Sequence, residues 1–363
     1  MITRESFEHT GRFIARVQTA TGAIPWFEGS TLDPWDHVEA AMGLSVGGFH
    51  AESEAAYLWL AQHQQPDGSW LAAYRNDAVV DGTRAETNFV AYIATGVWHH
   101  YLVTGNGAFL ADLWPTVRKA LEFVIDLQTP SGEIYWAVDT RTGINKDALI
   151  TGCSSIHKSL ECCANIAVVL GEDSLVWLQS RERLGIAIRD RPERFDRTWD
   201  KKSRYAMDWF YPILTGVVEG KAATKRLDEQ WRSFVVPDLG CRCVADEPWV
   251  TTAESCELTM ACLAAGYADK ALDLFGALSR YQAEDGSWWT GYAFADEVMW
   301  PDERPTWTAG AVMLAQDALE GLTGASRLFT SVNLPTTSAT SSPASSPASS
   351  PASSPASSPR SIV

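Results

Sequence analysis

The chain has 363 residues, of which 46% are hydrophobic and 20% charged, so it can bury a large core and intrinsic disorder is excluded for most of its length. Its 29 Lys and Arg residues against 45 Asp and Glu residues leave a net charge of −16 at pH 7. Nucleic acids and anionic membrane surfaces are bound through clustered cationic side chains, so this balance argues against both partners and favours a neutral ligand.

Before residue 331 the sequence predicts one helix after another, because apolar residues recur at i, i+3 and i+4 between clusters of Gly, Pro and Asp. The twelve predicted helices span residues 5–19, 34–47, 51–64, 84–104, 107–128, 152–170, 172–195, 206–218, 220–234, 252–266, 267–282 and 305–322. The fold prediction rests on the number and order of the helices and not on their ends, because helix ends are the least reliable part of such an assignment.

A short phrase recurs at the ends of three of these helices. It occupies residues 64–70, 128–132 and 282–288, with Gln four residues before Gly each time and Trp two residues after Gly in two cases. The Gly supplies the positive φ of a turn after a helix, and the Trp can pack back over that turn. A recurring helix end marks a repeated helical hairpin. Six such hairpins closed in a circle form an all-α (α/α)6 toroid with alternating inner and outer helices, and an open solenoid is the alternative.

The repeated phrase resembles the repeat of squalene cyclases and protein prenyltransferase β-subunits. That resemblance implies the toroid but says little about chemistry, because one fold hosts many reactions. The catalytic toroid is expected to cover residues 1–330. Residues 331–363 are expected to form a disordered tail, since from Ser341 the chain repeats Ser-Ser-Pro-Ala, which buries no apolar area.

The cellular location is inferred from the cysteines and the first residues. The seven cysteines form an odd set without the spacing of a disulfide framework, which suits reduced, buried thiols in the cytoplasm. Residues 1–6 carry no apolar segment behind their charges, so no secretory signal is expected. No stretch approaches the roughly 18 apolar residues that a membrane span needs.

Sixteen tryptophans are more than a single core requires, so some are expected to line a groove and offer flat faces to a ligand. If the helices that start near residues 34, 84, 152, 206, 252 and 305 form the inner circle, their N-termini open at one face of the toroid. Carboxylates and aromatic rings concentrate at these starts. The combination suggests sugar chemistry, because glycosidic cleavage uses two carboxyl groups while indole faces hold pyranose rings.

Asp36 and Glu254 are the predicted catalytic pair. Asp33-Pro34 fits an N-cap followed by N1, which places Asp36 at N3, and Thr251 as N-cap places Glu254 at N3 of its own helix. The two carboxyls would lie at matching depth, and an inverting enzyme holds such a pair roughly 6.5–9.5 Å apart. Which of the two is the acid and which the base stays open.

Structural alternatives exist for these acids. Thr251-x-x-Glu254 and Thr83-x-x-Glu86 both spell a capping box, in which the acid accepts from a backbone N–H, and Asp36 could simply complement the helix dipole. Glu39 and Glu257, three residues further on the same helical faces, are the fallback candidates, and Asp208 is a third. The predicted substrate contacts are Trp35, His37, Glu39, Asp208, Trp209, Tyr211, Trp249, Glu257, Trp300, Arg304 and Trp307, with at least half of these tryptophans expected to face the cavity.

Other chemistries of this fold fit less well. A terpene cyclase would be expected to carry an Asp-x-Asp-Asp run, or Asp-Asp-x-x-Asp to hold diphosphate, and neither occurs. A zinc prenyltransferase would need a His downstream of Cys241-Arg242-Cys243 and Asp246, but the last histidine is His157. We therefore predict no metal and no cofactor. A non-catalytic glycan-binding toroid remains the alternative without catalysis, although it has no reason to gather acids beside the tryptophans.

Three segments, residues 24–29, 33–42 and 247–250, resemble a group of actinobacterial prenyltransferase-like proteins that includes methylmannose polysaccharide hydrolases, which are endo-α-mannosidases of mycobacteria and their relatives. The resemblance implies internal cleavage of an α-1,4-linked, 3-O-methylated mannan with inversion. Taken together, the sequence predicts a glycoside hydrolase that acts on an α-mannoside-type oligosaccharide or polysaccharide.

Overall fold

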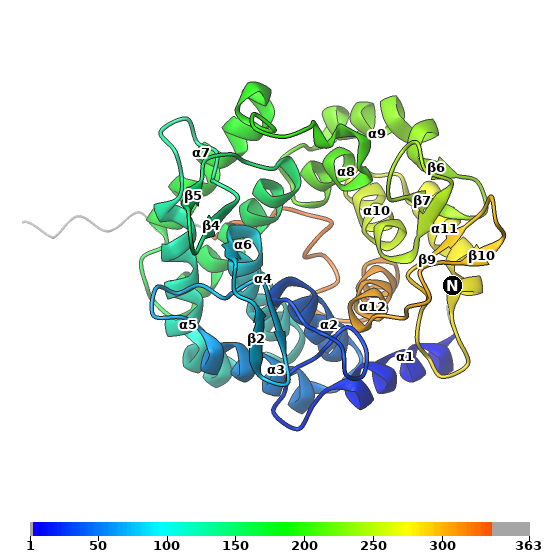
Figure 1. Cartoon of the computed structure of the whole chain (residues 1–363), viewed down its shortest axis with the longest axis horizontal. Coiled ribbons are helices and arrows are strands. Elements are labelled where there is room, and N and C mark those ends of the chain that lie inside the picture. Colours follow the sequence, from blue (N-terminus) through cyan, green and yellow to red (C-terminus); the bar gives the residue numbers. More distant parts are fainter. Residues whose placement is uncertain (1–2, 336–363) are drawn as a thin grey trace, which may run out of the picture.

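Twelve α-helices dominate residues 3–335, the part of the chain that the computed structural model describes (Figure 1). They are α1 (Arg4–Val17), α2 (Pro34–Val46), α3 (His50–His63), α4 (Thr87–Thr104), α5 (Gly107–Asp126), α6 (Ile150–Val169), α7 (Leu175–Asp190), α8 (Ala206–Leu214), α9 (Gly220–Phe234), α10 (Thr252–Ala264), α11 (Ala268–Gly276) and α12 (Thr306–Glu320). Each predicted helix is found in its expected place, and most ends lie within a few residues of the prediction.

The even-numbered helices form a closed inner circle, and the odd-numbered helices surround it (Figure 1). Each inner helix contacts the next, and α12 contacts α2. Inner helices such as α6 are buried along nearly their whole length, as expected for helices with neighbours on every side. The structure is therefore the predicted (α/α)6 toroid and not an open solenoid.

Glycines allow the first and last inner helices to meet. A Cβ added to Gly43 of α2 would lie 2.7 Å from the Cα of Gly310 in α12, and one added to Gly310 would lie 2.6 Å from the Glu39 carbonyl oxygen. Backbones can approach this closely only where neither residue has a side chain. This contact is where the circle closes.

The recurring phrase joins four of the six neighbouring pairs of outer helices. The Nε2 of Gln64 donates to Gly68 O at 3.0 Å and to Thr116 O of α5 at 2.9 Å. The equivalent amides of Gln18, Gln128 and Gln282 reach carbonyl oxygens of α3, α7 and α1. Gln18 begins a fourth copy of the phrase, with Gly22 in the matching place, which the sequence analysis missed.

Ten short strands, which the sequence analysis did not predict, lie in the connections. They are β1 (Ala73–Arg75), β2 (Ala78–Asp81), β3 (Arg84–Glu86), β4 (Ala137–Asp139), β5 (Gly143–Asn145), β6 (Val235–Val236), β7 (Gly240–Arg242), β8 (Trp249–Thr251), β9 (Gly291–Ala293) and β10 (Val298–Met299). Strands of two to four residues are too short to show an alternating pattern.

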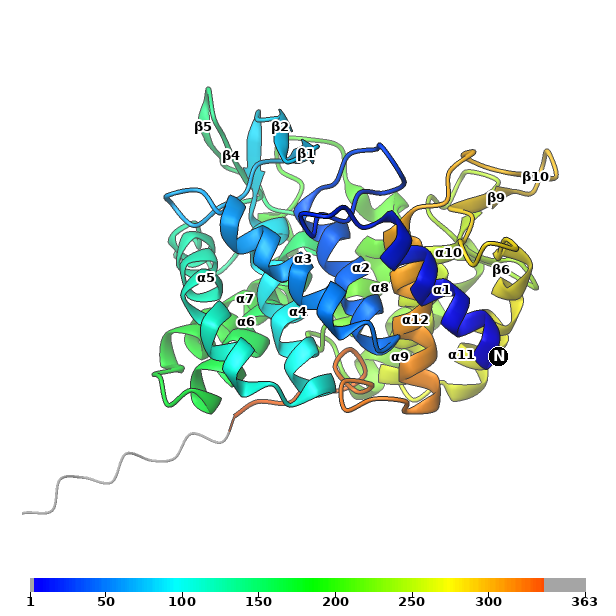
Figure 2. The same cartoon turned by 90° about the horizontal axis from the view of Figure 1, so that it is seen from below.

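The strands pair in antiparallel order as β1-β2, β3-β4-β5 and β10-β9-β8-β7-β6. The labelled hairpins project from one face of the toroid (Figure 2). β3 and β8 run directly into the first residues of α4 and α10, and so they fix where those two inner helices begin.

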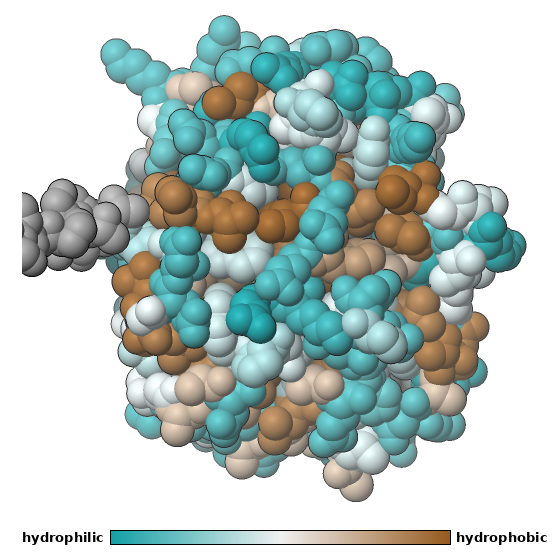
Figure 3. Space-filling model, turned by 90° about the vertical axis from the view of Figure 1, so that its left-hand side faces the viewer, coloured by the Kyte–Doolittle hydropathy of each residue, from teal (hydrophilic) through white to brown (hydrophobic). Residues whose placement is uncertain are grey.

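Residues 331–335, assigned to the tail from sequence, are described and lie against α6. The Lys158 Nζ donates to Ser331 O at 3.1 Å, and Asn165 Nδ2 donates to Asn333 O at 2.7 Å. The rest of the predicted tail lies outside the described residues. On the side of the toroid that Figure 3 shows, hydrophobic patches lie among hydrophilic side chains. Among the described helices, none is long and apolar enough to cross a membrane.

The copy of the phrase at residues 282–288 packs against α1, and this contact can be tested by substitution. Gly286 has a φ of +86°, and a Cβ there would lie 2.4 Å from His9 O, so Gly286→Ala should lower the free energy of unfolding by about 3 kcal/mol. Gly48 has a φ of +82° with open space around it, so Gly48→Ala should cost only about 1 kcal/mol. Urea unfolding of both variants measures the difference, and equal costs would contradict the role of the contact.

Candidate active site

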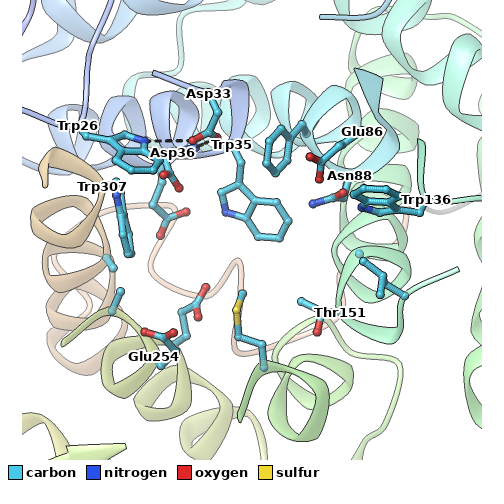
Figure 4. Close-up of a pocket in the computed structure, with 18 residues that line it drawn as sticks. Trp26, Asp33, Trp35, Asp36, Glu86, Asn88, Trp136, Thr151, Glu254 and Trp307 are labelled. Atoms are coloured by element: carbon cyan, nitrogen blue, oxygen red, sulfur yellow. Dashed lines mark hydrogen bonds between the residues drawn. The ribbon is translucent and has the colours of Figure 1, made fainter. Parts of the chain in front are cut away.

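A cavity of about 380 Å³ opens among the N-terminal ends of the inner helices (Figure 4). Six of the predicted site residues line it: Trp35, Asp36, Glu39, Glu254, Glu257 and Trp307. Twelve further residues complete the lining: Trp26, Asp33, Glu86, Asn88, Phe89, Trp136, Leu149, Thr151, Gly152, Met207, Ala253 and Ala311. No Lys or Arg is among these residues, which agrees with the neutral ligand expected from the composition.

Asp33 and Pro34 begin α2 as the sequence predicts. The Asp33 carboxylate caps the helix by accepting from the backbone N–H of Asp36 at 3.0 Å, and Pro34 occupies N1. The other carboxylate oxygen of Asp33 accepts from the Trp26 indole N–H at 3.1 Å. Asp36 therefore stands at N3, in the first turn of the helix, with its side chain in the cavity.

Glu254 occupies the matching position of α10, but the expected capping box does not form. Thr251 is the N-cap residue and makes no side-chain cap, and its hydroxyl is buried without a partner. The second expected box is also absent, because Glu86 pairs with Arg84 at 2.7 Å while the Thr83 hydroxyl donates to Asp81. Glu254 is half-buried in the cavity wall, and local capping does not account for its position.

Asp36 and Glu254 enter the same side of the cavity from two different inner helices (Figure 4). α2 supplies one and α10 the other, and in the circle α12 lies between these two helices. A ligand in the cavity can therefore contact both carboxyls.

The environment of Asp36 favours its protonated form. Desolvation deep in the cavity raises the pKa of Asp36 well above its usual value, and the neighbouring charges of Asp33, Glu39 and Glu257 raise it further. Burial also raises the pKa of Asp33, but hydrogen bonds from Asp36, Trp26 and Trp35 oppose that rise. Asp33 thus accepts the hydrogen bonds that stabilise a carboxylate, and the proton of the pair is favoured on Asp36.

A second pair of carboxyls forms the floor of the cavity. The Tyr92 hydroxyl donates to Glu39 Oε2 at 2.5 Å, and the Tyr211 hydroxyl donates to Glu257 Oε1. Burial raises the pKa of Glu39 to about 7 and that of Glu257 well above its usual value. The Trp35 ring packs on both tyrosines, with centroids 4.9 Å and 6.0 Å apart. Tyr211, a predicted substrate contact, instead lies beneath the lining and holds Glu257.

Three other predicted contacts on the inner helices point away from the cavity. His37 is fully buried, accepting from Ile24 N at 3.1 Å through Nδ1 and bonding Ala56 O at 2.9 Å through Nε2. Trp209 stacks on Phe234 and donates to Arg226 O, so it packs against α9. Asp208 does not line the cavity, and burial raises its pKa to about 6.

Trp249, Trp300 and Arg304 lie outside the cavity. The Trp249 indole donates to Trp300 O at 2.9 Å, and the two rings meet edge to face on the β8-β9-β10 sheet. Trp300 is 52% exposed. Arg304 bonds Asp285 and Ser287 of the repeated phrase. Of the five tryptophans considered from sequence, only Trp35 and Trp307 line the cavity, which is fewer than the expected half.

The lining residues that sequence reasoning missed follow two patterns. Asn88, Phe89, Thr151, Gly152 and Met207 lie in the first turns of α4, α6 and α8, and all but Phe89 differ from the acids and aromatic rings on which the site prediction rested. Trp26 and Trp136 come from connections, for which helix periodicity carries no signal. Within residues 3–335, no group of three or more His, Cys, Asp or Glu side chains is arranged to hold a metal ion.

The burial of His37 predicts a pH-dependent stability. Burial lowers the pKa of His37 from 6.5 to about 4, so its contribution is complete above pH 6.5 and is lost as the pH falls towards 4. That contribution amounts to about 3 kcal/mol. His37→Asn should flatten the fall in unfolding free energy between pH 6.5 and 4, measured by urea titration. Part of this fall should remain in the variant, because burial also lowers the pKa values of His99 and His157. An unchanged slope would exclude this account of His37.

Comparison with known proteins identifies the family. No protein-family model matches the chain. The MMP endo-(1,4)-3-O-methyl-alpha-D-mannosidase of Mycolicibacterium hassiacum is 46% identical over 335 residues, which cover 92% of this chain and 92% of that protein. A glycosidase variant in complex with glucose is 16% identical, with a TM-score of 0.67 over 88% of this chain and 96% of its own.

A GH63 mannosylglycerate hydrolase from Thermus thermophilus, in complex with glucose, is 13% identical, with a TM-score of 0.64 over 84% of this chain and 98% of its own. At these identities the two solved structures show a shared fold alone. The identity and coverage of the mycobacterial relative go further, and this chain belongs to the family of the MMP endo-(1,4)-3-O-methyl-alpha-D-mannosidase, within the glycoside hydrolases.

Proposed function

We propose that the protein cleaves internal α-1,4 linkages of a 3-O-methylated mannan with inversion at the anomeric carbon. The observation that carries the proposal is that Asp36 and Glu254, from two different inner helices, face one aromatic-lined cavity. The methylated mannoside and the internal mode of cleavage are taken from the name of the 46% identical relative.

Asp36 is the general acid in this proposal. An acid catalyst must hold a proton at working pH, and the desolvation of Asp36 beside Asp33, Glu39 and Glu257 favours that form. Asp33 is positioned to support it, because its capping bond to the Asp36 N–H fixes the first turn of α2. The glycosidic oxygen of a sugar in the cavity would take the proton from Asp36 as the bond to the anomeric carbon breaks.

Glu254 is the general base. It faces the same cavity as Asp36, is half-buried, and makes no cap at the start of α10, so its carboxylate is available to a water molecule. In an inverting reaction that water attacks the anomeric carbon from the face opposite the leaving oxygen while the base removes its proton. Two carboxyls that face one cavity from separate helices suit this arrangement.

The remaining lining suits a sugar. Trp26, Trp136 and Trp307 offer indole rings around the cavity, and aromatic faces pack against the C–H faces of pyranoses (Figure 4). The Trp307 Nε1 and the Asn88 Oδ1 are buried without hydrogen-bond partners. Because buried polar atoms are normally paired, a donor and an acceptor left open in this cavity fit ligand hydroxyls. A glycan-binding module would share these features but would have no use for a protonated Asp36.

We further propose that the enzyme works in the cytoplasm. All seven cysteines are unpaired, and six of them are buried. Unpaired thiols suit a reducing compartment.

Replacing the acid tests the assignment of Asp36. Asp36→Asn should lower kcat on methylated mannan oligosaccharides by about 10²–10⁴-fold, because the amide cannot deliver a proton. The wild-type rate should fall as the pH rises through the raised Asp36 pKa, since only the protonated acid is active. The variant should unfold no more readily than the wild type, because it removes a carboxyl from a cluster of like charges. Retained turnover in a folded variant would exclude this role.

Replacing the base tests both Glu254 and the stereochemistry. NMR of the wild-type reaction should show the β-anomer as the first product of an α-linked substrate. Glu254→Ala should lower kcat by about 10²–10⁴-fold. Added azide should restore turnover, because it replaces water as the nucleophile and gives the β-glycosyl azide as product. Glu219→Ala, an exposed acid at the start of α9, is the control and should retain the wild-type rate. An α-anomer as first product would rule out the inverting mechanism.

A further inference from the structure

The order of the helices in the circle divides the cavity into two halves. Five lining carboxyls, Asp33, Asp36, Glu39, Glu254 and Glu257, come from α2 and α10, which flank α12. The opposite half is built from α4, α6 and α8. Its one acid, Glu86, is paired with Arg84 at 2.7 Å. That half is therefore almost uncharged.

Apolar side chains form the wall of this second half. Phe89, Leu149 and Met207 line the cavity, and each is only half-buried. Phe89 meets the edge of Trp35 at a centroid distance of 6.1 Å, so the apolar surface continues up to the ring between the two halves. Gly152 adds no side chain, which leaves room beside Asn88. An apolar wall inside a cavity gains free energy when an apolar group of the ligand covers it.

Leu149 is an unfavourable choice for its local position. It is the N-cap residue of α6 and makes no side-chain cap, whereas Asn, Asp, Ser or Thr at an N-cap would bond an unpaired N–H. Residues that break a local rule are expected at functional sites. What the leucine side chain contributes here is apolar surface facing the cavity.

We propose that Phe89, Leu149 and Met207 form the subsite that recognises the O-methyl group of the sugar, an inference that rests on the proposed function. A methyl ether has no O–H to satisfy, so it can lie against the apolar wall, whereas a free hydroxyl there would lose its hydrogen bond to water. Asn88 Oδ1, buried and unpartnered beside this wall, accepts from one of the remaining hydroxyls and fixes the orientation of the sugar. The cavity thus selects methylated over plain mannosides.

Two substitutions at the wall test the subsite. The substrates are α-1,4-linked mannose oligosaccharides of equal length, 3-O-methylated or plain. The wild type should favour the methylated one by about 10-fold or more in kcat/KM. Leu149→Asn introduces a good N-cap residue and Met207→Gln keeps an unbranched side chain, and both should bring the ratio close to one by lowering kcat/KM for the methylated substrate.

Matched variants separate this effect from general damage. Met207→Leu should keep the wild-type ratio, because it preserves an apolar wall of similar volume. Val298→Asn, exposed on β10 and outside the cavity, should also keep it. A wild type without preference for the methylated substrate, or wall variants that retain the preference, would overturn the subsite.

Binding measurements distinguish failure of the subsite from failure of the proposed hydrolysis. Isothermal titration of the Asp36→Asn protein with the two oligosaccharides should show about 10-fold tighter binding of the methylated one, and adding Leu149→Asn should abolish the difference. If the wild type cleaves neither substrate while the binding preference is present, the hydrolase assignment fails and the subsite stands. If cleavage occurs with equal affinity for both sugars, the subsite fails and the hydrolase stands.

Discussion

The closure of the helical circle is the constraint on which the rest of the structure depends. α12 returns to α2 at the contact between Gly43 and Gly310, where neither helix has room for a side chain. The outer helices also form a closed circle, because the Gln282 side-chain amide donates to Ser6 O and to the Thr10 hydroxyl of α1. Only in a closed circle do the N-termini of α2 and α10, separated by most of the chain, open into one cavity.

That cavity concentrates like charges where the protein could have placed cations. Asp33, Asp36, Glu39, Glu254 and Glu257 share one space without a Lys or Arg among the lining residues. Helix N-termini and the hydroxyls of Tyr92 and Tyr211 offset part of the repulsion, and proton uptake offsets more, as the raised pKa values of Asp36, Glu39 and Glu257 show. Perturbed carboxyls of this kind cluster at functional sites.

A buried acid elsewhere in the toroid shows the contrast. Glu161 of α6 is as deeply buried as Glu257, but Lys158 and Arg181 pair with it at 2.8 Å and 2.7 Å. Glu161 Oε1 also accepts a hydrogen bond from the backbone N–H of Asn333, which holds the last described residues against α6. This structural acid has two cations beside it. In the cavity the protein provides tyrosines and other acids, which keep protons available to a ligand.

The sequence by itself determined the helices, their order and the Asp33 cap of α2, because these depend on local periodicity and on residues a few positions apart. The repeated Gln-x-x-x-Gly phrase identified the hairpins, and Asp33-Pro34 and Thr251 placed Asp36 and Glu254 in the first turns of their helices. Only the tertiary structure decided which first-turn side chains face inward. The direction of a side chain around its helix axis depends on how that helix packs in the circle, so His37 and Trp209 turned outward. Trp26 and Trp136 reached the cavity from connections whose course is set by contacts remote in sequence.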